Sequence, residues 1–126
     1  MNATRLTLLA VLSPLLFACA SPPPPAPPKP PAEPSAGTWR GSSTRFQADS
    51  RGCPHPGLVT LRVMDDRFQY RWDSRTWIDV AIDPDGTLHG EGPGITLVGK
   101  RLGKRIEGDV TNGDCGLHFT AAKQAN

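Results

Sequence analysis

Nine of the 14 prolines in this 126-residue chain lie within residues 22–34, and this run limits what the chain can fold into. Proline lacks a backbone N–H and has a fixed φ, so a segment this rich in it forms neither helix nor sheet ladders and adopts polyproline II. All 13 glycines lie further along, from Gly37 to Gly116. About 90 residues therefore remain to build a core, which is enough for one small domain and too few for a Rossmann or TIM-barrel architecture.

Residues 1–18 have the pattern of a signal peptide. Arg5 supplies a positive charge, and residues 6–17 form an apolar run interrupted only by two hydroxyl side chains and a proline. A helix that crosses the ~30 Å hydrocarbon core of a bilayer needs ~20 residues, so this run is too short to span a membrane. Its length fits the apolar region of a secretory signal.

The end of this segment, Leu16-Phe17-Ala18-Cys19, resembles the lipobox of bacterial lipoproteins, with an aliphatic residue three positions before the cysteine and a small residue directly before it. The resemblance implies cleavage before Cys19, attachment of a diacylglycerol to its thiol and acylation of the new amino terminus, with palmitate as a label for these chains. Two or three acyl chains hold a protein stably on a membrane, whereas one holds it only marginally. The alternative is an ordinary secretory signal or an uncleaved signal anchor, with Cys19 there by chance.

We expect residues 19–36 to be the lipidated cysteine followed by a proline-rich tether. In polyproline II, at ~3.1 Å per residue, the 17 residues after Cys19 reach roughly 50 Å, which fits a semi-rigid spacer between membrane and domain. Its PxxP patterns also fit docking on an aromatic groove of another protein. By the sorting known for enteric lipoproteins, Ala20 and Ser21 carry no inner-membrane retention signal. The resemblance therefore favours the periplasmic face of the outer membrane of a bacterial cell envelope.

Residues 37–126 are predicted to form an all-β domain. Apolar and polar residues alternate with a period of two, and the segments are bounded by Gly, Pro and Asp. In three segments, 58–64, 68–73 and 76–83, the inward residues are Val59, Leu61 and Val63, then Phe68, Tyr70 and Trp72, then Ile78, Val80 and Ile82. The other expected strands are 38–48, 87–92, 95–102, 105–111 and 115–122. Short connections favour a small antiparallel meander of about eight strands, forming a barrel or a compact sandwich, and closure of a barrel removes exposed edges.

Glycines inside the expected strands, Gly90, Gly99 and Gly108, are typical of tight bends in a small curved barrel. The start of the domain, Gly37-Thr38-Trp39, resembles the G-x-W element that opens the first strand of lipocalin-like barrels. A similar start occurs in small periplasmic β-barrel inhibitors of bacterial metalloproteases. The resemblance covers three residues and implies a barrel with Trp39 plugging one end.

The chain has three cysteines. If Cys19 is the lipid acceptor, Cys53 and Cys115 remain as a pair in an oxidising compartment, and we predict a disulfide between them. The disulfide would close a loop of 62 residues. A zinc site is the competing hypothesis, because Cys53-x-His55 and Cys115-x-x-His118 make a Cys₂His₂ set. The C-x-H spacing is uncommon for zinc, and export favours oxidation over thiolate ligation.

Two clusters are candidate binding surfaces. Alternation turns Trp77 outward near Arg71 and Arg75, and an exposed Trp beside Arg is typical of a contact hot spot. In the alternative interpretation, Trp77 folds over the barrel mouth and closes the core. The second cluster is a basic hairpin tip, suited to anionic head groups or wall polymers, or simply a solvated turn. Its four cations are Lys100, Arg101, Lys104 and Arg105.

Motifs for chemistry are missing from the sequence: it has no G-x-S-x-G, no H-E-x-x-H, no phosphate loop and no dinucleotide fingerprint. Asp65-Asp66 and residues 83–86 are better explained as turns than as an acid–base pair or a calcium loop. The net charge of +2 is far below that expected of a nucleic-acid-binding domain. We predict that the protein is not an enzyme, with no catalytic residue, metal, cofactor or nucleic-acid partner.

The sequence thus predicts a membrane-anchored periplasmic lipoprotein that serves as a non-enzymatic binding or interaction module for a protein or envelope polymer. One alternative is an inhibitor of a periplasmic hydrolase, either a protease or a lysozyme, acting through the exposed loop of residues 53–57. A second alternative is a lipocalin-like carrier of a small apolar ligand. The carrier needs a cavity, which a solid core built on aromatic side chains would exclude.

Overall fold

The structure is a computed structural model that describes residues 19–28 and 34–125. The signal peptide predicted for residues 1–18 lies outside the described residues, as do positions 29–33 of the tether. The chain divides into two units, Met1–Pro30 and Pro31–Asn126. Residues 19–28 form neither helix nor strand, and Cys19 among them is exposed and takes part in no disulfide. Within the described residues, no helix is long and apolar enough to cross a bilayer.

The second unit is all-β, as the sequence predicts, with eight strands in the described residues. The strands are β1 (Gly37–Ala48), β2 (Leu58–Val63), β3 (Arg67–Arg71), β4 (Trp77–Ile82), β5 (Thr87–Gly92), β6 (Ile95–Leu102), β7 (Arg105–Thr111) and β8 (Cys115–Lys123).

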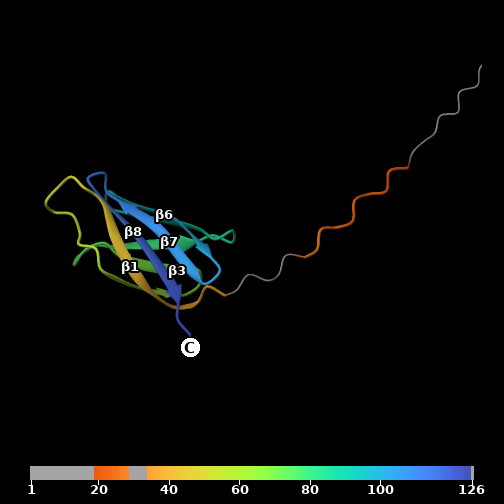
Figure 1. Ribbon diagram of the computed structural model, residues 1–126, viewed down its shortest axis with the longest axis horizontal. Coiled ribbons are helices and arrows are strands. Elements are labelled where there is room, and N and C mark those ends of the chain that lie inside the picture. Colours follow the sequence, from red (N-terminus) through yellow and green to blue (C-terminus); the bar gives the residue numbers. More distant parts are fainter. Residues whose placement is uncertain (1–18, 29–33, 126) are drawn as a thin grey trace, which may run out of the picture. The chain divides into compact units, whose positions relative to one another are not determined.

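All eight strands belong to one antiparallel sheet in the order β2-β1-β8-β7-β6-β5-β4-β3. Strands β3 to β8 pair as a meander, and β1 pairs with both β2 and β8, so that the first and last strands lie side by side (Figure 1). The two ends of this order, β2 and β3, meet only through an isolated bridge between Met64 and Arg67. The sheet is therefore a nearly closed barrel with a gap in its wall between β2 and β3, which we call the β2–β3 seam.

The core fills the barrel, and it contains all nine side chains that alternation predicted to point inward. Each of them is exposed by 8% or less. Trp39 is fully buried, and its indole N–H donates to the carbonyl oxygen of Ser35 at 2.9 Å. The Ser35 hydroxyl donates in turn to the carboxylate of Asp66, in the turn between β2 and β3. Trp39 thus joins the last residues of the tether to this end of the barrel.

Two glycines allow β6 and β7 to approach closely where the sheet curves. Gly99 and Gly108 are direct partners in the β6–β7 ladder. A Cβ atom at Gly99 would overlap the carbonyl oxygen of Glu107, and one at Gly108 would lie 2.9 Å from a ring carbon of Phe119. Only glycine fits such contacts, as expected of tight bends in a small barrel.

Candidate binding cleft at the seam

A cleft of about 570 Å³ opens along the β2–β3 seam. It lies at the end of the barrel that carries the loop between β1 and β2 and the hairpin between β3 and β4. Its volume is within the range of small-ligand pockets, roughly 300–1,000 Å³. A second, smaller hollow lies further along the same seam, between the outer faces of β2, β3 and β4. Both hollows therefore lie along the seam.

The floor of the cleft is apolar, because it is made by the core-facing side chains next to the gap. These side chains are Val59, Leu61, Tyr70, Trp72 and Leu117. The Tyr70 ring packs against Phe119 with 4.8 Å between the ring centroids. Burial raises the pKa of Tyr70 to about 12, opposed in part by a hydrogen bond with Ser43. Tyr70 therefore stays protonated near neutral pH and keeps a neutral hydroxyl in the floor.

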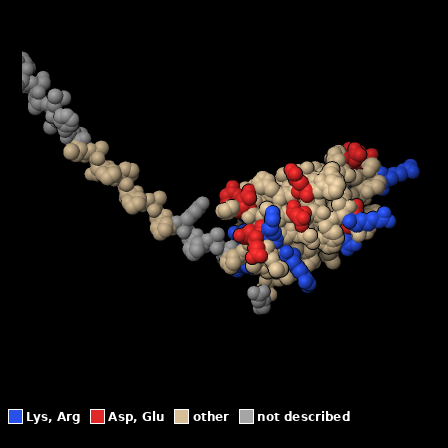
Figure 2. Space-filling view, turned by 180° about the vertical axis from the view of Figure 1, so that it is seen from behind, with Lys and Arg blue, Asp and Glu red and all other residues tan. Residues whose placement is uncertain are grey.

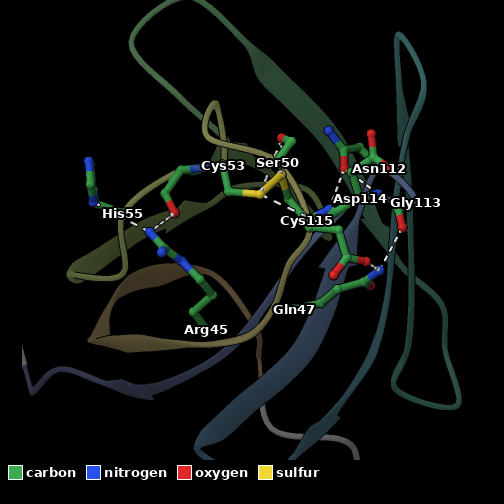
Figure 3. Close-up of a disulfide and its surroundings, with 11 residues drawn as sticks. Arg45, Gln47, Ser50, Cys53, His55, Asn112, Gly113, Asp114 and Cys115 are labelled. Atoms are coloured by element: carbon green, nitrogen blue, oxygen red, sulfur yellow. Dashed lines mark hydrogen bonds between the residues drawn. A yellow bond between two sulfur atoms is a disulfide. The ribbon is translucent and has the colours of Figure 1, made fainter.

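One rim of the cleft is formed by the loop between β1 and β2, which the predicted disulfide fixes in place (Figure 3). The Cα atoms of Cys53 and Cys115 are 5.3 Å apart. Arg45 on β1 donates from Nη2 to the carbonyl oxygen of Pro54 at 2.9 Å, and the same nitrogen lies 3.4 Å from Nδ1 of His55. The disulfide and the Arg45 contacts thus hold Pro54 and the exposed His55 at the cleft.

The disulfide argues against the zinc hypothesis, because it removes two of the four proposed ligands. Both thiols of the proposed Cys₂His₂ set are joined to each other in the disulfide. Nδ1 of His118 lies 2.6 Å from a carboxylate oxygen of Asp109, while His55 contacts Arg45. These contacts pair the histidines with other side chains, and no group of three or more potential metal ligands is found among the described residues.

The opposite rim is the β3–β4 hairpin, whose turn is held by Asp73. Its Oδ1 accepts hydrogen bonds from the backbone N–H groups of Arg75 and Thr76, both at 2.8 Å. The bond from Arg75 is the main reason why the pKa of Asp73 lies below its usual value of 3.8. The Asp73 carboxylate therefore binds backbone groups of its own turn. The guanidinium groups of Arg71 and Arg75 lie next to it on the rim.

Arg71 and Trp77 stand together on this rim. They are direct cross-strand partners in the β3–β4 ladder, and the Arg71 guanidinium carbon lies 5.7 Å from the centroid of the Trp77 ring. Arg71 also donates from Nε to the carbonyl oxygen of Asp73 at 3.1 Å. Trp77 is 53% exposed, so the outward orientation inferred from alternation is right, and Trp77 does not close the barrel mouth. Arg75 belongs to the adjacent turn.

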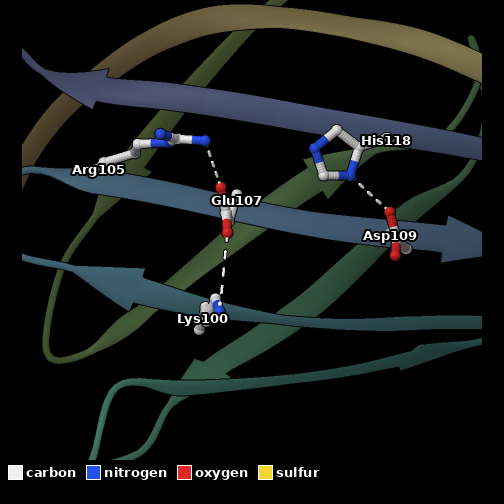
Figure 4. A network of polar contacts seen from close by, with 5 residues as sticks. All are labelled: Lys100, Arg105, Glu107, Asp109 and His118. Atoms are coloured by element: carbon white, nitrogen blue, oxygen red, sulfur yellow. Dashed lines mark hydrogen bonds and ion pairs between the residues drawn. The ribbon is translucent and has the colours of Figure 1, made fainter.

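The basic hairpin tip lies at the opposite end of the barrel. Three strands, β4, β5 and β6, separate it from the β3–β4 turn along the meander, and each strand carries the chain from one end of the barrel to the other. Glu107 lies between two of its cations, 3.9 Å from Lys100 and 2.5 Å from Arg105 (Figure 4). Lys104 is exposed in the turn, and Arg101 is half-buried. The two predicted surfaces are therefore separate, and the charge of the tip is partly neutralised.

Charges of both signs are interspersed elsewhere on the domain, as the face seen in Figure 2 shows. The outward side chains of β2 and β3 differ, because their charged residues are all basic: Arg62, Arg67 and Arg71. The ion pairs found among the described residues involve none of these three arginines.

The seam itself was not predicted from the sequence. A meander with short connections implies that the strand 58–64 pairs with the strand after it, whereas the structure pairs the two only at Met64 and Arg67. One signal was present: alternation leaves Leu58 and Met64 on the outward face, and these side chains are 94% and 70% exposed. Single exposed apolar side chains are common on protein surfaces, so this signal alone does not locate the seam.

Comparisons with protein-family models, with curated proteins and with solved structures gave no match. The assignment of a function therefore rests on the residues and their geometry.

Proposed function

We propose that this protein is a lipid-anchored binding module of the bacterial cell envelope and that its ligand docks in the cleft at the β2–β3 seam. The observation that carries the proposal is the cleft itself, which combines an apolar floor with a rim that presents Trp77 and Arg71. Binding hot spots are enriched in Trp and Arg next to pockets that can be fully desolvated.

Two titratable side chains at the cleft, Tyr70 and Asp73, are poorly suited to proton transfer near neutral pH. Tyr70 keeps its proton because burial raises its pKa, and Asp73 is engaged by the backbone of its own turn. General acid–base catalysis needs groups whose pKa lies near the working pH. His55 is the remaining titratable side chain lining the cleft, and it lies beside the Arg45 guanidinium.

The proposed cellular location of the protein rests on the lipobox-like sequence at Cys19, the proline-rich tether and the disulfide. A disulfide between Cys53 and Cys115 fits an oxidising compartment such as the periplasm. In this proposal, acyl chains on Cys19 hold the protein on the periplasmic face of the outer membrane, and the tether presents the barrel to a protein or polymer of the envelope.

Crosslinking in intact cells tests the proposal. The lipidated protein is crosslinked to its neighbours, and the adducts are identified by mass spectrometry for wild type, Trp77→Ala and Val98→Ala. Val98 is a matched control, since it is 52% exposed, close to Trp77, and lies on β6 away from the seam. We expect one discrete adduct that Trp77→Ala weakens about tenfold or more and Val98→Ala retains. Equal loss in both variants, or no discrete adduct, contradicts the proposal.

Inhibition of a periplasmic hydrolase is the second candidate, favoured by the loop that forms one rim. Cys53 anchors this loop through the disulfide, while His55, Pro56 and Gly57 remain exposed. A rigid exposed loop suits insertion into an active site, because little conformational entropy is lost on binding. The purified full-length protein is expected to inhibit a protease or a lysozyme and to lose inhibition on His55→Ala. An unaffected panel of these enzymes removes this candidate.

The carrier alternative receives no support from the barrel interior. Trp39, Phe68, Tyr70 and Trp72 pack there with exposures of 0–6%, where a carrier would need a cavity. We therefore do not propose it.

A further inference from the structure

We infer that the ligand of the β2–β3 seam is an extended acidic segment of another protein, which adds a β-strand in the gap between β2 and β3. This inference rests on the proposed binding function and names the chemical class of the partner. It follows from three features of the seam: backbone groups without a ladder partner, an apolar floor, and a basic outer border.

The backbone N–H and C=O groups of alternate β2 residues point into the seam. Residues along an antiparallel strand point their N–H and C=O groups alternately to one neighbour and to the other. The bond from the Ser43 N–H to the Gly57 carbonyl sets this phase on β2, so every second residue from Gly57 onward faces β1. The residues between them direct both groups into the seam. They are Leu58, Thr60 and Arg62.

Alternate residues of β3 also direct their backbone groups into the seam. The Ile82 N–H donates to the Asp66 carbonyl, and the Trp72 N–H donates to the Thr76 carbonyl, so the even-numbered residues of β3 face β4. Gln69 and Arg71 therefore direct their backbone groups into the seam from the other side. Among the described residues, none of these seam groups has a backbone partner in the sheet. Edges of this kind are templates for an added strand.

Side-chain alternation then specifies the ligand. A strand in the seam points alternate side chains toward the cleft floor and toward solvent. The floor is apolar and offers the Tyr70 hydroxyl, so the inward residues of the ligand are apolar. The outward residues lie beside Arg62, Arg67 and Arg71, and carboxylates complement that border.

Acidic side chains lie near this border as well. Asp65 and Asp66 precede Arg67 in the turn between β2 and β3, where Asp66 accepts from Ser35, and Asp73 is held by the β3–β4 turn. The charged outward side chains of β2 and β3 themselves are all basic. Asp79 on β4 is the acidic side chain nearest to it in the second hollow, and Gln69 donates from Nε2 to its carboxylate at 3.0 Å. Leu58, Met64 and Trp77 add exposed apolar contacts around the gap. The partner is thus an extended segment in which apolar residues alternate with Asp or Glu. The span from Leu58 to Arg62 matches about five residues of it, at ~3.4 Å each.

The test uses a synthetic fluorescent heptapeptide, Val-Glu-Val-Glu-Val-Glu-Val, and the full-length lipidated protein in detergent. Binding is measured by fluorescence anisotropy against the same peptide with Lys in place of Glu. We expect the Glu peptide to bind at least tenfold more tightly, and to slow hydrogen exchange of the seam amides of Thr60 and Gln69. Equal binding of the two peptides, or unchanged exchange of these amides, overturns the inference.

A pair of variants separates strand addition from contact with the side chain. Thr60→Pro removes an N–H that faces the seam and leaves the ladder with β1 intact, since Pro is tolerated on edge strands. Thr60→Ala removes only the side chain. We expect Thr60→Pro to weaken binding of the Glu peptide about tenfold and Thr60→Ala to leave it within twofold. Gln69→Pro repeats the test on β3 if Thr60→Pro fails to fold. Equal effects of Pro and Ala overturn strand addition.

Charge reversal tests the acidic character of the ligand. Arg62→Glu at the seam is expected to weaken binding about tenfold, whereas Lys104→Glu at the opposite end of the barrel makes the same change of charge and leaves binding within twofold. Sensitivity to Arg62→Glu without sensitivity to Thr60→Pro would indicate an acidic polymer held by charge alone, and would overturn the inference. A dimer that dissociates on Thr60→Pro would place a second copy of this chain in the seam, with the same consequence.

Failure of this inference can be told apart from failure of the proposed function. If crosslinking in cells gives an adduct that depends on Trp77 while the seam amides keep their exchange rates, the cleft binds a ligand that is not a strand. If neither readout responds, the seam is not the binding site.

Discussion

Removing the Cys53–Cys115 disulfide is expected to lower the free energy of unfolding by about 4 kcal/mol. The two cysteines are 62 residues apart, and a loop of this length gives about 4 kcal/mol in the chain-entropy treatment of the unfolded state. Small domains have free energies of unfolding of about 5–15 kcal/mol in total. The disulfide therefore supplies a large share of the stability of this barrel, and both cysteines also belong to its core.

The assay is equilibrium unfolding in urea, followed by tryptophan fluorescence. The double variant Cys53→Ala/Cys115→Ala is compared with wild type and with Cys19→Ala, whose thiol is exposed and unbridged. With a urea dependence of about 1–3 kcal/mol per molar, the midpoint is expected to fall by roughly 2 M, or the double variant is already unfolded in buffer. Cys19→Ala is expected to unfold like the wild type.

A loss below about 1 kcal/mol in the double variant would refute this reasoning. It would mean that the loop between β1 and β2 is ordered without its crosslink and that the unfolded chain gains little freedom from its removal. If the loss is the expected value of about 4 kcal/mol, the loop that carries Pro54 is less ordered without the disulfide. The cleft is then expected to bind its ligand more weakly after reduction of the disulfide.

Three further predictions concern the bends, the rim and the anchor. Gly99→Ala is expected to cost about 2 kcal/mol in urea unfolding, because its Cβ would overlap the Glu107 carbonyl, whereas Gly52→Ala, with open space around it, is expected to cost far less; equal costs would contradict the account of the bend. Asp73→Ala is expected to destabilise the protein at neutral pH. The pKa of Asp73 is lowered on folding, so its contribution to the free energy of unfolding is present above the unfolded pKa near 3.8 and is lost as pH falls through the lower folded pKa. A difference in the free energy of unfolding between wild type and Asp73→Ala that does not become smaller in acid would argue against this. Metabolic labelling with palmitate is expected to mark the wild type and not Cys19→Ala, and label that persists in the variant would remove the lipid anchor from the proposal.

Alternation along the strands made the faces of this barrel predictable. Residues such as Phe68, Tyr70 and Ile78 had to be buried, because a shift by one residue would have turned every apolar side chain of its strand into solvent. The outward position of Trp77 followed from the same rule. The disulfide was predictable because two cysteines remained once Cys19 was set aside.

The sequence predicted the meander that joins β3 to β8, but not how far each pair of neighbouring strands stays paired or in which register. Alternation fixes which way a side chain points and says nothing about whether β2 and β3 stay paired beyond Met64 and Arg67. The partial neutralisation of the basic tip could not be predicted either, because it depends on how two strands are aligned. Glu107 becomes a neighbour of Lys100 only through the register of β6 and β7.

Site-specific photocrosslinking in living cells tests the central claim, that the seam is the binding surface, most directly. A photoreactive phenylalanine derivative is placed at Leu58, which lines the cleft, in one strain and at Val98 in another, two exposed positions on different parts of the barrel wall. The account predicts a discrete crosslinked product from position 58 and none from position 98. No product from position 58, or the same product from both positions, would contradict it.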